Sequence, residues 1–408
     1  MFSLEAVLFF IGLLLVATFL QTYAKKFGIP FHIILILLGF AGSELATQYF
    51  SIDTGIRWDN FQGIIFYLFL PVLIFESAQK IDAEELWKGL IPILLLALPL
   101  MLIAAFITAF ILYFAIGHPV GFPWITALLA GILLSATDPA AIIASLEKTK
   151  APKRLKVLLE GESLFNDATA VVFFTLLVAV ASGRESMFSW YSGTIQFLQV
   201  FFGGITVGVI VSLVAGVILL KTQLRYIHVL INFIAAYGSY IISDHIFHFS
   251  GVMAVLAAGL IFGKLKTKIN DIQSRKFTED IWGFAAYSVE LLLFLFAGVS
   301  ITAGMFTQQW LAMLIGIASV IVARFVIICG ILSPVSRLPG IEPLPLNQQV
   351  IMTWGGVRGT VTIALALSLP LQLESWFTVQ SIAYGVVLFT LLFQTTTIDI
   401  VVGRSKPS

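Results

Sequence analysis

The stretch LSATDPAA, residues 134–141, lies inside a longer apolar run. Its Asp138-Pro139 pair predicts a break or kink, because proline lacks the backbone N–H donor and clashes with the preceding helical turn. A second apolar run, at 347–371, contains WGGVRGT at 354–360, where three glycines weaken the helix around an arginine. In hydrocarbon such interruptions are tolerated only where protein or a water-filled cavity surrounds them. Both runs therefore predict interrupted helices within a membrane.

Composition indicates that the whole chain belongs in a bilayer. Of its 408 residues, 59% are hydrophobic and 11% are charged, and the mean hydropathy is +1.01. Soluble domains are about 45–50% apolar and about 25% charged, and a water-soluble core of this length could not bury so much apolar surface. The net charge of +1 suggests no nucleic-acid partner. We therefore expect an all-α integral membrane protein, with the lipid bilayer as its surroundings.

Breaks at charged, Pro-rich and Gly-rich stretches divide the chain into 13 predicted transmembrane helices, most of them near or above the ~20 residues that cross hydrocarbon. Their approximate ranges are 4–23, 30–50, 61–79, 90–117, 122–145, 157–182, 195–220, 226–244, 250–263, 279–301, 307–333, 347–371 and 374–402. Nearly all lysines and arginines then fall in alternate loops, and the opposite loops hold only Arg57 and Arg184. This asymmetry predicts an outside N-terminus and an inside C-terminus.

The two interrupted spans are the fifth and the twelfth of this series. Their separation by seven spans predicts two six-helix repeats, spans one to six and eight to thirteen, with the second repeat inverted. In secondary transporters built this way, the substrate site lies near the midplane, where discontinuous helices meet. Asp138 would neutralise half-helix N-termini there, and Arg358 or Arg324 would neutralise C-terminal ends or a carboxylate.

The sixth span carries a polar stripe within EGESLFNDATA, residues 160–170. Ser163, Asn166 and Asp167 lie three or four residues apart and therefore share a helix face, with Glu162 on its flank. Oxygen ligands of this kind suit a dehydrated hard cation, and the carboxylate can equally take a proton. The alternative is a polar contact between helices made by the hydroxyl and the amide. The two carboxylates favour an ion site, because charge inside a membrane is costly.

Four motifs together resemble a known family. They are FESA at 75–78, ATDP at 136–139, ESLFND at 162–167 and GGVRG at 355–359. In this order and spacing they are similar to the NhaP-type sodium/proton antiporters of the monovalent cation:proton antiporter-1 family, relatives of the animal sodium/proton exchangers. The resemblance covers nearly the whole chain. It implies a secondary active antiporter, not an enzyme, that exchanges Na⁺ or Li⁺ for H⁺ by alternating access.

The resemblance also implies an ion site. Asp167 would be the carboxylate shared by cation and proton, while Ser163 and the Thr137 backbone or hydroxyl would complete the Na⁺ shell. Glu76 would contribute directly or through water, and Asn166 would orient the site. The Asn-Asp pair resembles that of electroneutral exchangers, one cation for one proton, because only one of the two side chains titrates.

Supporting charges follow from the same resemblance. Asp138 would balance the dipoles of the crossing helices. Glu162 would form a buried ion pair with an arginine, Arg324 by family pattern, with Arg358 bracing the twelfth span; the sequence itself leaves the choice of arginine open. The family further implies a homodimer without cofactors in the cell (inner) membrane, serving pH homeostasis. We expect a core bundle at approximately 61–182 and 307–402 and a dimer scaffold at approximately 1–50 and 195–301.

Three other functions stay open at this point. Exchange of K⁺ for H⁺ is the first, because oxygen ligands alone do not reveal the size of the cavity. A cation channel is the second, although the sequence contains no filter-like repeat of backbone carbonyl donors. A membrane sensor that binds an ion without moving it is the third. A saturable, proton-coupled cation flux would distinguish the antiporter from the last two.

Overall fold

Helices make up the regular structure of this chain. The protein is described here by a computed structural model covering residues 4–27, 30–49, 61–117, 121–149, 153–183, 190–269, 271–335 and 345–405. Within these ranges no β-strand occurs, so the predicted all-α class is confirmed. Arg57 and Arg184, the basic residues of the predicted outer loops, lie outside them.

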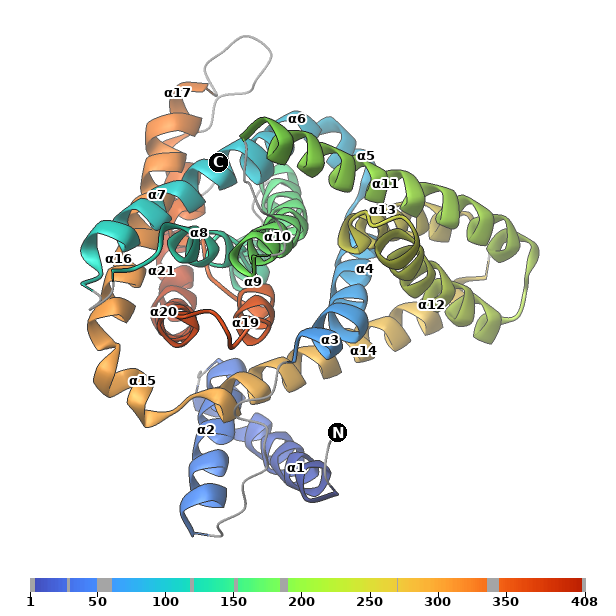
Figure 1. Ribbon diagram of the computed structural model, residues 1–408. Helices are drawn as coiled ribbons and strands as arrows, with labels where there is room; N and C mark the ends of the chain where they lie inside the picture. The colour runs from blue at the N-terminus through green and yellow to red at the C-terminus, as the bar shows by residue number, and fades with distance from the viewer. Residues whose placement is uncertain are drawn as a thin grey trace. The chain divides into compact units, whose positions relative to one another are not determined.

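In chain order (Figure 1) the α-helices are α1 (Leu4–Phe27), α2 (Phe31–Tyr49), α3 (Gln62–Ile64), α4 (Leu70–Lys80), α5 (Ala83–Lys88), α6 (Leu90–Leu95), α7 (Met101–Ala115), α8 (Trp124–Leu133), α9 (Ala140–Lys148), α10 (Lys153–Ala181), α11 (Trp190–Lys221), α12 (Arg225–Ile241), α13 (Gly251–Leu265), α14 (Ile272–Ser300), α15 (Ala303–Gln308), α16 (Trp310–Phe325), α17 (Ser333–Val335), α18 (Leu346–Trp354), α19 (Thr360–Leu367), α20 (Trp376–Phe389) and α21 (Thr395–Ser405). The described chain also contains the π-helical turns η2 (Ile65–Phe69), η3 (Leu96–Leu100), η4 (Ile242–Ile246), η6 (Val326–Leu332) and η7 (Thr390–Gln394), and the 3₁₀ turn η5 (Lys266–Lys268).

Eight helices of the described chain are long and apolar enough to cross a membrane. Each coincides with a predicted span, and they are Gln62–Lys80, Leu90–Ala115, Lys153–Ala181, Gly193–Lys221, Arg225–Ile246, Ile272–Ser300, Trp310–Leu332 and Trp376–Arg404. Three further predicted spans coincide with α1, α2 and α13. The remaining two are the fifth and the twelfth, and each is split into two helices. The exact count of 13 transmembrane helices stays a prediction.

The two splits fall where the sequence predicts them. Helix α8 ends at Leu133 and α9 begins at Ala140, so the segment between them contains the Asp-Pro pair. Helix α18 ends at Trp354 and α19 begins at Thr360, with the glycine-rich segment between them. The interruption of both spans is therefore a feature of the fold.

One compact unit comprises residues 1–61, 100–156 and 291–408. In it α16 packs against α7 and α20, and α20 also packs against α8 and α19 (Figure 1). Helix α21 packs against α9 and α18. Glycines allow the close approach: a Cβ at Gly385 would lie 2.8 Å from Met313 Cβ, and one at Gly316 would meet Ile382. This unit contains both interrupted spans.

The second unit comprises residues 62–99 and 157–290. Here α13 packs against α4, α11 and α12 (Figure 1). The buried Trp282 lies between Phe75 and Phe233, with ring centroids 4.7 and 4.6 Å away. This unit contains the polar stripe of α10. The predicted division into a core bundle and a dimer scaffold stays a prediction.

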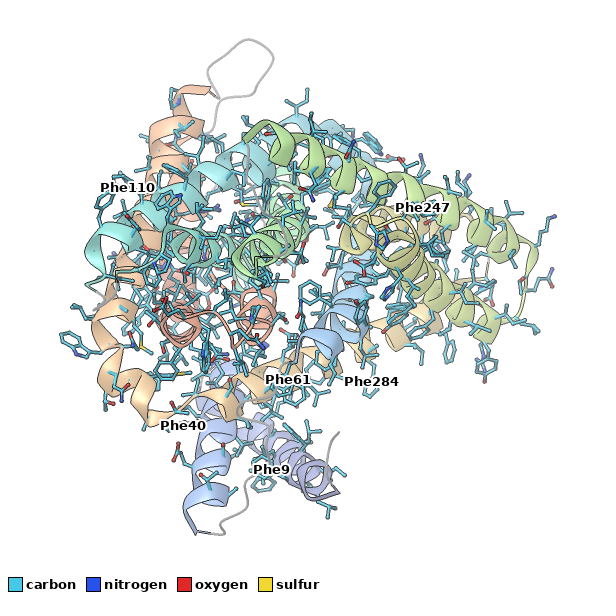
Figure 2. All side chains as sticks on the ribbon, in the orientation of Figure 1. Phe9, Phe40, Phe61, Phe110, Phe247 and Phe284 are labelled. Carbon is cyan, nitrogen blue, oxygen red and sulfur yellow. The ribbon has the colours of Figure 1, made fainter. Side chains whose placement is uncertain are left out.

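Apolar side chains cover much of the exposed surface. Phe110, Phe247 and Phe284 point outward (Figure 2) and are 51%, 53% and 70% exposed. By contrast, Phe61 is buried and stacks on Phe296 at 4.9 Å. Soluble monomers rarely expose large apolar patches, whereas lipid tails solvate them. The surface agrees with the membrane class that composition predicts.

Candidate functional site

The two interrupted segments meet in the first unit. The Asp138 backbone N–H donates to Val357 O at 2.8 Å, and Thr362 Oγ1 donates to Ala136 O at 3.4 Å. Residues 134–139 and 355–359, which we call the crossing, therefore lie side by side although more than two hundred residues separate them in the sequence. The Asp138 N–H and the Val357 carbonyl thus satisfy each other, as membrane-embedded irregular backbone requires.

Asp138 lies against the beginnings of two half-helices. Its Oδ1 accepts from the Ala140 N–H at 3.0 Å, in the first turn of α9. Its side chain also lies against Gly359, which immediately precedes α19: a Cβ at that glycine would lie 2.5 Å from Asp138 Cβ. Helix N-termini carry partial positive charge. The carboxylate therefore stands where its predicted dipole-balancing role requires it, and the role itself stays a prediction.

Two arginines lie at the opposite ends of the half-helices. Arg358, which is 4% exposed, donates from Nη1 to Ser135 O at 3.5 Å, just beyond the C-terminus of α8. Arg324 donates from Nε to Met352 O at 3.2 Å, in the last turn of α18. Its stem covers Gly356, where a Cβ would lie 3.3 Å from Arg324 Nε. Cations at helix C-termini are stabilising, so both arginines complement the crossing.

The polar stripe belongs to α10, in the second unit. Ser163 and Asn166 are buried, Asp167 is half-buried, and Glu162 is 2% exposed. The helix is one unbroken element from Lys153 to Ala181, so the spacing does place the three stripe residues on one face. The prediction that Asp167, Ser163 and Thr137 together hold Na⁺ stays a prediction, as does the arginine partner of Glu162.

Glu76 has a partner that the sequence analysis did not consider. It is buried on α4, and its carboxylate pairs with Lys80, one turn along the same helix. The lysine side chain is 72% exposed. A glutamate and a lysine four residues apart on a helix predict such an ion pair from the sequence alone. The predicted contribution of Glu76 to the cation site stays a prediction.

Other polar residues escaped the sequence analysis. In the second unit, Gln79 Nε2 donates to Asn232 Oδ1 at 2.6 Å, and Asn232 Nδ2 donates to His228 O at 2.8 Å. In the first unit, the hydroxyls of Thr362 and Thr390 bond the backbone of the crossing. Their only signal in the sequence is a polar side chain within an apolar run, which many helices share.

A membrane-spanning all-α fold, with two interrupted helices that meet and charges placed at their ends, defines a secondary transporter of the discontinuous-helix class. The family described as sodium/hydrogen exchanger, transmembrane, matches residues 11–404. The chain belongs to this family, and the resemblance read from its motifs is confirmed. It is a multi-pass membrane protein.

Individual relatives agree. The chain is 32% identical to the Na⁺/H⁺ antiporter ApNhaP of Aphanothece halophytica, over 95% of this chain and 72% of that protein. It is 31% identical to the low-affinity Na⁺/H⁺ antiporter NhaS1 of Synechocystis sp., over 95% and 71%. The sodium proton antiporter MjNhaP1 of Methanocaldococcus jannaschii has a similar fold, with a TM-score of 0.81 and 18% identity over 99% of this chain and 100% of that one.

Proposed function

We propose that this chain exchanges Na⁺ for H⁺ across a membrane by alternating access, one cation for one proton. The observation that carries the proposal is the crossing, in which two interrupted helices meet and a carboxylate lies at two half-helix N-termini. A fold of this kind builds its ion site from unwound backbone and nearby carboxylates. Membership of the sodium/hydrogen exchanger family supplies the chemistry.

Asp167 is the proposed carrier of both ions. Moving an ionised carboxylate past an apolar barrier costs several kcal/mol. A proton or a Na⁺ neutralises the same charge, so the two compete, and only a loaded carboxylate crosses at an appreciable rate. Ser163 and Thr137 provide oxygen ligands of the kind that suit Na⁺, and Asn166 orients the site. Obligatory exchange follows from this asymmetry between loaded and empty forms.

The wider arrangement is part of the proposal. It comprises 13 transmembrane helices with the N-terminus outside, two inverted six-helix repeats, a homodimer in the cell (inner) membrane, and no cofactor. Support for the repeats comes from the interrupted helices, which occupy the fifth and twelfth predicted spans. Relatives named as Na⁺/H⁺ antiporters favour Na⁺ over K⁺. The two interrupted helices favour a transporter over a channel.

Reconstitution in liposomes tests the proposal. Protein is reconstituted with an internal pH dye, a proton gradient is imposed, and Na⁺, Li⁺ or K⁺ is added with the membrane potential clamped. We expect Na⁺ and Li⁺ to dissipate the gradient at a rate independent of the clamped potential. Asp167→Asn should abolish this, while Asp280→Asn, the same change at an exposed carboxylate of α14, should not. Exchange that persists in Asp167→Asn contradicts the carrier role, and a response to K⁺ alone contradicts the substrate.

A further inference from the structure

Thr390 stands outside every predicted role, yet its hydroxyl bonds the crossing. It is 2% exposed and lies where α20 passes into the π turn η7. Its Oγ1 accepts from the Arg358 N–H at 3.2 Å. The hydroxyl proton has two acceptors in reach, Val387 O of its own helix at 3.1 Å and Arg358 O at 3.4 Å. The hydroxyl therefore bonds the arginine backbone from a neighbouring helix.

The bond between Thr390 and Arg358 also affects Asp138. The Arg358 N–H and the Val357 C=O belong to one planar peptide unit, and their directions are fixed relative to each other. Thr390 holds the N–H end, and the Asp138 N–H donates to the C=O end at 2.8 Å. Rotating this peptide breaks both bonds at once. The threonine hydroxyl thus determines the direction in which the Val357 carbonyl meets the backbone of Asp138.

A second observation concerns the same residue. Thr390 is the first residue of the π turn Thr390–Gln394, within a helix that continues from Trp376 to Arg404. Single π turns inside α-helices occur frequently at functional sites. Here the irregular turn begins at the residue that contacts the crossing.

We propose that Thr390 is a positioning residue for cation exchange. Through the peptide between Val357 and Arg358 it fixes the backbone at Asp138, next to Thr137, which is a predicted cation ligand. The inference rests on the proposed function and adds to it a residue that touches no ion.

The test compares Thr390→Val, which keeps the volume and removes the acceptor, with Thr390→Ser, which keeps the acceptor. Thr378→Val is the matched control, because Thr378 is a buried threonine of α20, the helix that leads into η7, and has no bond to the crossing. The rate of Na⁺-driven proton flux in liposomes is measured against Na⁺ concentration. We expect Thr390→Val to raise the apparent KM for Na⁺ about 10-fold, because the Arg358 N–H loses its acceptor and the peptide that it shares with Val357 is no longer held. Thr390→Ser and Thr378→Val should stay within about 2-fold of wild type.

The outcomes separate positioning from mere stability. A lower maximal rate with unchanged KM reports less active protein and overturns the proposal, and so does an unchanged KM and rate in Thr390→Val. If that variant is not recovered as monodisperse protein, Thr390→Cys, with its weaker acceptor, should raise KM to an intermediate value; a wild-type KM overturns the proposal. Wild-type protein without Na⁺-driven flux overturns the proposed function, and the positioning role with it.

Discussion

Replacing Gly359 by alanine tests the electrostatic design of the crossing directly. A Cβ at this position would lie 2.5 Å from Asp138 Cβ and 2.9 Å from its Cγ, and still closer to Oδ2. Because the whole side chain stands in the way, rotating the carboxylate alone does not clear the clash. Either Asp138 moves and loses its bond to the Ala140 N–H, or the two backbone segments separate.

Both responses have similar costs. Losing a hydrogen bond from a charged acceptor costs roughly 1.5–3 kcal/mol, and forcing an extra methyl group into a packed site costs roughly 1–3 kcal/mol. We therefore expect Gly359→Ala to lower the free energy of unfolding by about 2 kcal/mol. The measurement is unfolding in mixed detergent micelles, followed by tryptophan fluorescence.

A control variant and a double-mutant cycle make this prediction refutable. Gly238→Ala is the control, because Gly238 lies inside helix α12 and a Cβ there would meet nothing within 4 Å. This change should leave the free energy of unfolding unchanged or raise it by up to ~1 kcal/mol. Asp138→Ala combined with Gly359→Ala should cost less than the sum of the two single changes, since Asp138→Ala removes the Cγ and Oδ2 atoms that the added Cβ would meet. Additive costs, or a Gly359→Ala protein as stable as the Gly238→Ala control, would refute the reasoning.

Two further predictions concern the second unit. Gln79→Leu removes the donor to Asn232 Oδ1 and should lower the free energy of unfolding by roughly 1–3 kcal/mol. The comparison is Gln308→Leu, at an exposed amide of α15. Equal stability of the two variants contradicts the prediction. Asp271, just before α14, has its pKa held below the ordinary value, chiefly because the Ser274 hydroxyl donates to its Oδ2 at 2.6 Å. The stabilisation is thus present above the unfolded pKa of about 3.9 and lost as pH falls through the lower folded pKa. Wild type should exceed Asp271→Ala in thermal stability at pH 7, and a difference that does not shrink in acid contradicts this.

The interruptions of the fifth and twelfth spans were predictable because their causes are local. Pro139 removes a helix donor whatever surrounds it, and three glycines weaken a helix in any context. The stripe on α10 was likewise predictable, since helical spacing alone places Ser163 and Asp167 on one face. These features depend on the residue itself or on neighbours within one turn.

The backbone partners of the two arginines were not predictable, for a physical reason. Arg324 donates to the Met352 carbonyl and Arg358 to the Ser135 carbonyl. Every residue has such a carbonyl, so the sequence contains no mark that distinguishes the acceptor. The partner of the Thr390 hydroxyl was unpredictable as well, because many threonines in apolar helices bond only their own backbone. Long-range pairing of a side chain with a backbone group requires the fold.

The π turn at Thr390–Gln394 has a geometric consequence for the helix that contains it. A π turn holds one residue more than an α turn, and one residue corresponds to about 100° of rotation about the axis. The faces before and after η7 are therefore out of phase. Helix α20 packs against α8, α16 and α19, whereas α21, on the same rod, packs against α9 and α18. This continuous helix therefore contacts two sets of neighbours, and its helical phase changes at Thr390, whose hydroxyl bonds the crossing.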